Sequence, residues 1–296
     1  MIEMRALTKI LLTGLLVAPL SLLAQVADET PAVSKDKLVR QIELDTLRLN
    51  HRFQSASVQH RVHSQRMLWF AVGNVALGTA GYFWSQEAWG TSSGSFHLKK
   101  DWTGDGLAQN DELSHLIIAY NFSYILQPVY QWLGFSPSKS MTFSTMHTAV
   151  ATTLIEYPID AHNPLQGFGT SDLIANYVGC GLALGQYHLP ALRNFGLKIS
   201  FKQAPWVANS HGVAGTAKEF DNEIMWLTFR PVHKRIDFIH FGLGYSTNHF
   251  QPSVEREYYL GVGTSIPDAV NIVSPKVARW ISPLRMVYLE LHRRLK

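Results

Sequence analysis

The sequence predicts an α+β protein, in which an N-terminal bundle of about four to five helices is followed by a small antiparallel β-meander. Between residues 67 and 190, weakly charged stretches carry small and apolar residues at helical spacing. After Pro190, short segments rich in aromatic and β-branched residues alternate with turn signals, as antiparallel strands do. A chain of 296 residues with 46% hydrophobic and 16% charged residues is long and apolar enough to bury a large core.

Residues 1–24 have the composition of a secretory signal peptide. Two basic residues precede an apolar run at 10–20, which is too short to span a bilayer, and cleavage is expected after Ala24 or Ala27. We therefore expect an exported protein of a Gram-negative bacterium, in the periplasm or associated with the outer membrane. Cys180 is the only cysteine, so the sequence predicts neither an internal disulfide bond nor a lipid anchor.

The charge of the chain bears on the kind of partner it binds. Residues 1–24 contain two of the 26 basic and one of the 22 acidic residues, so their removal leaves 24 against 21, a net charge of +3. A nearly balanced protein is not expected to bind nucleic acid. The predicted partners are a membrane lipid or an envelope protein.

Two helical segments are expected directly after the signal. Residues 25–66 are polar, with apolar residues spaced by three or four, which predicts an amphipathic helix. Met67–Trp84 is nearly uncharged over 18 residues and fits either a buried helix or a helix that touches a membrane. In either setting Gly73, Gly78 and Gly81 would allow another helix to approach closely.

Three more helices complete the expected helical core at 67–190. Asp111–Gly134 is one, and Pro128 is expected to kink or end it. Met141–Tyr157 is the next, rich in alanine and threonine. The last begins near Thr170, and a stripe of small residues follows one of its faces at Ala175, Gly179 and Ala183.

Six polar residues lie on or beside these helices: Asp111, His115, Glu156, Asp160, Asp172 and Asn176. One interpretation is a hydrogen-bonded lock between helices, because buried polar groups need partners. The other is a hydrolase or metal-assisted site, with His115 as base or ligand and the carboxylates orienting it or holding a cation. The lock is favoured, since no nucleophile elbow, phosphate loop, CxxC pair or HExxH motif is present.

The loop before the predicted Asp111–Gly134 helix matches part of a calcium-binding template. Asp101, Thr103, Asp105 and Glu112 fall at positions one, three, five and twelve, with Gly106 at position six. Thr103 stands where Asp or Asn is usual, and no helix is expected to enter the loop. The alternatives are therefore a calcium site, with calcium as the one predicted cofactor, and a capped turn that starts the next helix.

The region 191–296 is expected to form a β-rich layer packed on the helices. Pro267 and Pro275 predict that residues 265–284 form a loop. Five segments have strand character: Lys198–Lys202, Glu223–Phe229, Asp237–Ser246, Arg256–Thr264 and Arg285–Leu291.

Several of these motifs occur together in a known family. They are Asp111-x-x-x-His115, Glu156-x-x-x-Asp160, Gly167-Phe168-Gly169-x-Ser171-Asp172-Leu173-x-Ala175-Asn176 and Gly179. Over roughly residues 66–265 the chain resembles the YfiM-like predicted periplasmic lipoproteins. Its helical part is more faintly similar to VanZ-like membrane proteins, in which a His, a Glu and a Ser-Asp-x-x-x-Asn-x-x-Gly pattern occur in the same order.

The chain departs from the first family by lacking a lipobox cysteine and by carrying Glu112 where a lysine follows the aspartate. The resemblance implies export and a fold, and it implies no particular reaction. From the sequence we expect a non-enzymatic envelope protein that has a structural role or binds a ligand or partner. The alternative is an envelope hydrolase or metal-dependent enzyme that uses the His–carboxylate cluster on a lipid-linked or cell-wall substrate.

Overall fold

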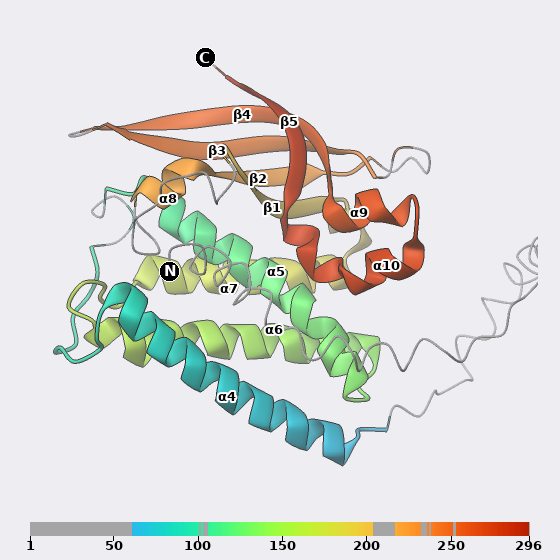
Figure 1. Ribbon diagram of the computed structural model, residues 1–296, viewed down its shortest axis with the longest axis horizontal. Coiled ribbons are helices and arrows are strands. Elements are labelled where there is room, and N and C mark those ends of the chain that lie inside the picture. The colour runs from blue at the N-terminus through green and yellow to red at the C-terminus, as the bar shows by residue number, and fades with distance from the viewer. Residues whose placement is uncertain are drawn as a thin grey trace, which may run out of the picture.

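The computed structural model describes residues 61–100, 102, 106–203, 217–231, 236, 238–250 and 253–295. The predicted signal peptide and most of the predicted amphipathic helix at 25–66 lie outside these residues. The described chain is α+β, as predicted, with helices in its N-terminal part and a five-stranded antiparallel sheet in its C-terminal part. Figure 1 shows the sheet above helices α5 and α7, with α4 on the far side of the bundle.

Four long helices form the first layer: α4 (Ser64–Trp89), α5 (Asn110–Trp132), α6 (Pro137–Leu154) and α7 (Thr170–His188). The α6 helix starts earlier than predicted because the Ser136 hydroxyl caps it, accepting a hydrogen bond from the Lys139 amide, and Pro137 suits a first turn. After Leu154 the chain passes through a π-helical turn, Ile155–Ile159, and a 3-10 turn, Asp160–His162. The α5 helix continues four residues past Pro128, so the proline does not end it.

The small-residue stripe of α7 allows α5 and α7 to pack closely. A Cβ added to Gly179 would lie 2.3 Å from the Leu116 carbonyl oxygen of α5, and Ala175 and Ala183 are buried on the same face. No described helix approaches Gly73, Gly78 or Gly81 of α4 in this way. A Cβ at any of these three α4 glycines would meet nothing within 4 Å.

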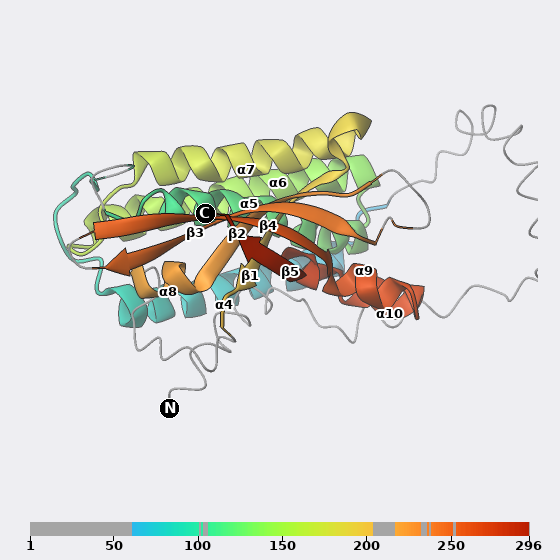
Figure 2. The same ribbon diagram turned by 90° about the horizontal axis from the view of Figure 1, so that it is seen from above.

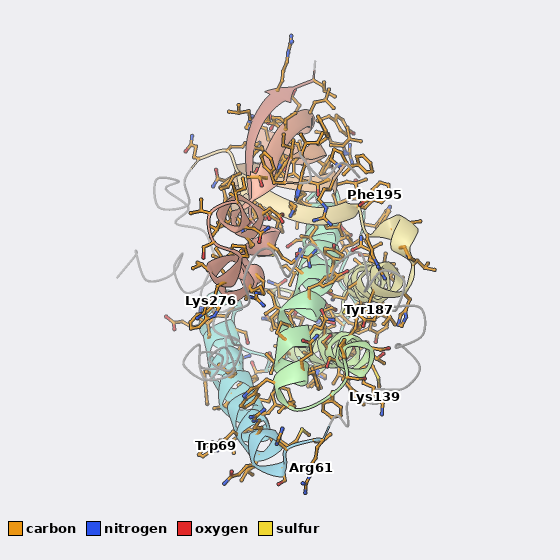
Figure 3. The ribbon with its side chains drawn as sticks, turned by 90° about the vertical axis from the view of Figure 1, so that its right-hand side faces the viewer. Arg61, Trp69, Lys139, Tyr187, Phe195 and Lys276 are labelled. Carbon is orange, nitrogen blue, oxygen red and sulfur yellow. The ribbon has the colours of Figure 1, made fainter. Side chains whose placement is uncertain are left out.

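The alternative that Met67–Trp84 is a buried helix is wrong in the described structure. The α4 helix contacts α5 and α6 chiefly near its start, where Arg66 stacks over Trp132 and Phe70 packs against Tyr130 and His147. The opposite side of α4 is exposed, and Figure 3 shows Trp69 pointing away from the bundle. Low charge alone does not bury a helix, because burial requires a partner with a matching face.

The second layer is a meander in the order β1-β2-β3-β4-β5, with every neighbouring pair antiparallel. Trp226 fills its concave face, where a Cβ added to Gly242, Gly244 or Gly261 would lie 2.7 to 2.8 Å from the indole ring. A bridge between Ile199 and Val287 brings the two edge strands together, so the sheet is strongly curved. The strands are β1 (Phe195–Phe201), β2 (Glu223–Phe229), β3 (His240–Phe250), β4 (Ser253–Ser265) and β5 (Tyr288–Arg294).

The prediction of a loop at 265–284 is wrong. The segment contains α9 (Ile266–Asn271), α10 (Pro275–Trp280) and the start of a 3-10 turn (Ser282–Met286), and Figure 2 shows α9 and α10 side by side at one end of the sheet. The prolines occupy the first turns of these helices, where no intrahelical N–H bond is lost, and a serine caps each helix.

The main core lies between the helices and the β1–β2 side of the sheet. It contains Ile117 and Tyr120 of α5, Met141 of α6, and Leu197 and Met225 of the sheet. Beyond this contact the outer face of the sheet is exposed. It carries apolar residues on all five strands: Phe195, Leu227, Phe229, Phe241, Leu243, Tyr258, Leu260, Val262, Leu289 and Leu291.

No helix in the described ranges combines the length and the apolar character that crossing a membrane requires.

Candidate functional site

The structure brings the six predicted polar residues together at one end of the helical bundle. His115 of α5 lies 3.6 Å from Asp111 one turn earlier, 3.5 Å from Glu156 of the π-helical turn and 3.1 Å from the Asn176 amide of α7. Asp111, His115 and Asp172 each offer a ligand atom within 4.8 Å of the others. Asp160 lies close enough to His115 for the two charges to interact. We call this group, with Lys99 described next, the polar centre.

Lys99 joins the polar centre, and the sequence did not predict it. Its ammonium contacts Asp111 and lies 3.0 Å from Asp172, so one lysine bridges α5 and α7. The loop that carries it is held by two backbone hydrogen bonds, from the Lys99 amide to the Phe168 carbonyl and from the Phe168 amide to the His97 carbonyl. A signal was nevertheless present, because four of the six predicted residues are carboxylates and only one is a histidine.

The charges of the polar centre depend on one another. Burial disfavours the charged forms of His115 and Lys99, but the surrounding carboxylates outweigh burial. Asp111 holds the pKa of His115 at about 9, and Asp111 and Asp172 hold the pKa of Lys99 above its ordinary value. Both groups are therefore cations at neutral pH. Burial also opposes ionisation of Asp111, but His115 and Lys99 keep its pKa well below the usual range.

The pKa values of the remaining acids are shifted upward. Burial raises the pKa of Glu156 to about 8 and that of Asp160 to about 6, and it raises the pKa of Asp172 as well. At neutral pH Glu156 is mostly protonated, and the polar centre contains two cations against a similar number of anions. The network is therefore close to neutral, which is the condition under which buried charges are tolerated.

Several oxygens of the polar centre are buried without a hydrogen-bond partner in the described structure. The Glu156 oxygen nearest to His115 is one of them, since its 3.5 Å separation lacks hydrogen-bond geometry. Buried acceptors of this kind are compatible with a bound cation, bound water or a proton on the acid. The oxygens are Glu156 Oε1, Asp160 Oδ1, Asp172 Oδ1 and Asn176 Oδ1, and Oε2 of the neighbouring Glu112 is a further one.

Only part of the polar centre is accessible from outside. About a quarter of the His115 side chain is exposed, whereas Glu156 and Asp172 are almost completely buried. A solute can therefore reach the imidazole before it reaches the inner carboxylates. The protonated imidazole can donate a proton or bind an anion, but it must lose its proton to act as a base or a metal ligand.

The predicted calcium loop stays a prediction. Asp101, Thr103 and Asp105 lie outside the described residues. Glu112 is buried beside the polar centre, where one carboxylate oxygen accepts hydrogen bonds from the Ser171 hydroxyl at 2.8 Å and from the Trp102 amide at 2.9 Å. In the described structure Glu112 thus connects the loop to the first turn of α7.

No known protein family, no curated protein and no solved structure matches this chain.

Proposed function

We propose that this chain is a non-enzymatic protein of the cell envelope that lies against a lipid surface, and that the polar centre is the lock that holds its helices together. The observation that carries the proposal is the exposed side of α4. Trp69, Val75 and Phe83 of this helix are 67%, 71% and 67% exposed, although such side chains are usually buried. The same side carries no charged residue between Met67 and Trp84.

Two further surfaces also expose large apolar side chains. The α6 and α7 helices expose seven large apolar residues, and the outer face of the sheet exposes another set. A monomeric soluble protein rarely exposes contiguous apolar patches larger than a few hundred Å². A lipid surface imposes no detailed shape and therefore fits an apolar helix face such as that of α4, whereas a protein partner would need a complementary surface. The helical residues are Phe143, Met146, Val150, Leu154, Ile174, Tyr177 and Val178.

The lock supports this function by holding the apolar elements in a fixed arrangement. Lys99, Asp111, Glu156 and Asp172 come from four segments: the 91–109 loop, α5, the π-helical turn after α6, and α7. Their mutual neutralisation favours a structural role, because a cluster that balances its own charge needs no substrate to complete it.

Binding of lipid vesicles tests this proposal. Val75→Asp should lower the partition of the protein onto vesicles about tenfold, because burying a valine contributes about 1.5 kcal/mol or more and a carboxylate resists leaving water. Co-sedimentation with phosphatidylglycerol–phosphatidylethanolamine vesicles measures the partition. Gln65→Asp is the control, since it adds the same charge on an exposed polar position of the same helix. Equal partition of the two variants would contradict the proposal.

The alternative proposal is a metal-dependent hydrolase centred on His115. It is favoured by one observation, the buried carboxylate oxygens of Glu156 and Asp172 that lack hydrogen-bond partners beside the imidazole. A cation held by Asp111, His115 and Asp172 would have to displace the Lys99 ammonium and accept a deprotonated imidazole. Both requirements count against it, and so the lock is the preferred function.

Metal binding separates the two proposals. If the alternative holds, Mn²⁺ or Zn²⁺ should raise the melting temperature, with affinity increasing as the pH rises, and Asp172→Asn should remove the effect. Differential scanning fluorimetry with and without each ion measures this. Glu255→Gln, which changes an exposed carboxylate far from the centre along the chain, should leave the shift unchanged. Absence of any metal-dependent shift in the wild type would leave only the lock.

A further inference from the structure

A second polar site lies at the other end of α7. An open cavity of about 280 Å³ is lined by the segment after α7, the adjoining ends of β1, β2 and β3, and the α9 region. It shares no residue with the polar centre. Its charged and titratable lining residues are Arg193, Lys198, Arg230, His240, Asp268 and Arg285.

The lining of this cavity is strongly basic. Its lining includes four lysine or arginine residues and a single acid, Asp268. Within the described part of the chain, none of these four cations forms an ion pair with a carboxylate. Arg193 instead donates to the carbonyls of Gln186 and Tyr187, and Arg285 stacks on the Tyr124 ring at 4.1 Å. The cavity therefore concentrates positive charge that its own acid does not neutralise.

Two buried side chains leave hydrogen-bonding capacity at the cavity. Lys198 is 5% exposed, and in the described structure its Nζ donates a hydrogen bond to the Arg285 carbonyl at 2.8 Å. An ammonium has three hydrogens to donate, so this bond alone does not satisfy it. His240 is also 5% exposed, and among the described residues Nδ1 has no hydrogen-bond partner, while Nε2 lies 3.3 Å from Asp268 without hydrogen-bond geometry.

The protonation of Lys198 reflects the same imbalance. Burial, together with the positive charges of Arg285 and Arg230, lowers its pKa to about 7, and Asp268 offsets this shift only in part. His240 of β3 also lines the cavity. A bound anion would reverse the balance, since it would favour the ammonium form and allow both lysine and arginine to donate to it.

We propose that this cavity binds a compact oxyanion of the phosphate type, with Lys198 and Arg230 as its main charged contacts and His240 as a further donor. Phe195, at the start of β1, lines the cavity, while its ring packs against Phe229 on the outer face of the sheet. Figure 3 shows Phe195 at this edge of the sheet. Lys198, Arg230 and His240 would contact a free anion and the phosphate group of an ester in the same way.

Calorimetric titration of the purified full chain with sulfate and with inorganic phosphate tests the proposal. The wild type should bind both, and Lys198→Met should weaken binding about tenfold, the effect of losing one charge-assisted hydrogen bond. Lys276→Met is the control, since Lys276 is exposed on α10 and does not line the cavity. No binding by the wild type, or equal binding by Lys198→Met, overturns the proposal.

Arg230→Gln provides a second test, because Lys198→Met changes a buried residue and can alter folding. Arg230 is only partly buried, so its replacement should preserve the fold, which circular dichroism checks. Binding should again weaken about tenfold, because one charged contact is lost. Unchanged sulfate affinity in a folded Arg230→Gln protein overturns the role of the cavity.

The pH dependence of sulfate binding adds an independent measurement, because sulfate keeps its charge between pH 6 and pH 8. Lys198 changes from mostly charged to mostly neutral across this interval, so the affinity of the wild type should fall as the pH rises. Lys198→Met should show a smaller fall. An affinity that does not change with pH in the wild type contradicts the contribution of Lys198.

Competition identifies the source of the anion. Vesicles that contain phosphatidic acid should displace sulfate if the ligand is a lipid headgroup, while glycerol phosphate should do so if the ligand is a soluble ester. Either displacement supports the oxyanion site. If none of phosphatidic acid vesicles, glycerol phosphate and inorganic phosphate displaces sulfate, the oxyanion site is overturned.

Discussion

Replacing Lys99 with methionine is expected to lower the free energy of unfolding by about 3 kcal/mol, the size of effect seen when one partner of a buried ion pair is removed. Lys99 is largely buried and contacts both Asp111 and Asp172. Methionine retains the length of the side chain but not its charge, so two buried carboxylates would be left beside each other. Protonation of one acid would relieve part of the repulsion, and the loss should therefore be smaller at low pH.

Urea unfolding followed by circular dichroism measures this loss, and the adjacent lysine provides a matched control. Lys100 is exposed, so Lys100→Met removes the same charge from the same loop without disturbing the polar centre, and its stability should equal that of the wild type. If Lys99→Met is as stable as Lys100→Met, the polar centre does not lock the helices.

Replacing Gly179 with alanine is expected to be the most disruptive single-methyl change in α7. The added Cβ would lie 2.3 Å from the Leu116 carbonyl oxygen and 3.0 Å from the Tyr120 amide nitrogen, both of them backbone atoms of α5. Backbone atoms cannot rotate away, so α5 and α7 must separate, and the expected cost is about 3 kcal/mol, at the upper end for overpacking. The separation would also disturb His115 and Asn176, which meet across the same interface.

Gly181, two residues further along the same helix, serves as the control for Gly179. A Cβ at Gly181 meets nothing within 4 Å, so alanine should increase stability by about 0.5–1 kcal/mol through its higher helix propensity. Thermal unfolding of the two variants measures the difference. Equal melting temperatures would mean that α5 and α7 are not in close contact in solution.

The sequence predicted the elements whose signals are local. Glu223–Phe229 was predicted with the bounds that the structure has, and the helix from Asp111 was predicted to within one residue of its start. Alternation of apolar residues and the charge of a helix's first turn act over a few residues, so they can be recognised without knowing the fold. The prediction of a loop at 265–284 is wrong because proline, which breaks a helix in its interior, is favoured in the first turn.

In the polar centre, too, the sequence predicts some contacts and not others. Asp111 and His115 are one helical turn apart, so their proximity follows from the sequence. Lys99 is 73 residues from Asp172, and no sequence spacing relates the two. The basic cavity was also not predicted, because Lys198, Arg230, His240 and Arg285 come from different elements and meet only when the sheet curves.

The sequence by itself determined the α+β class, the order of helices and strands, and the small-residue face of α7, because these depend on the periodicity of neighbouring residues. Tertiary structure decided which faces are covered. It left the outward side of α4 exposed, placed Lys99 between two carboxylates and assembled the basic cavity. Burial and the pKa values that follow from it depend on contacts between distant segments, and the residues of a single segment do not contain that information.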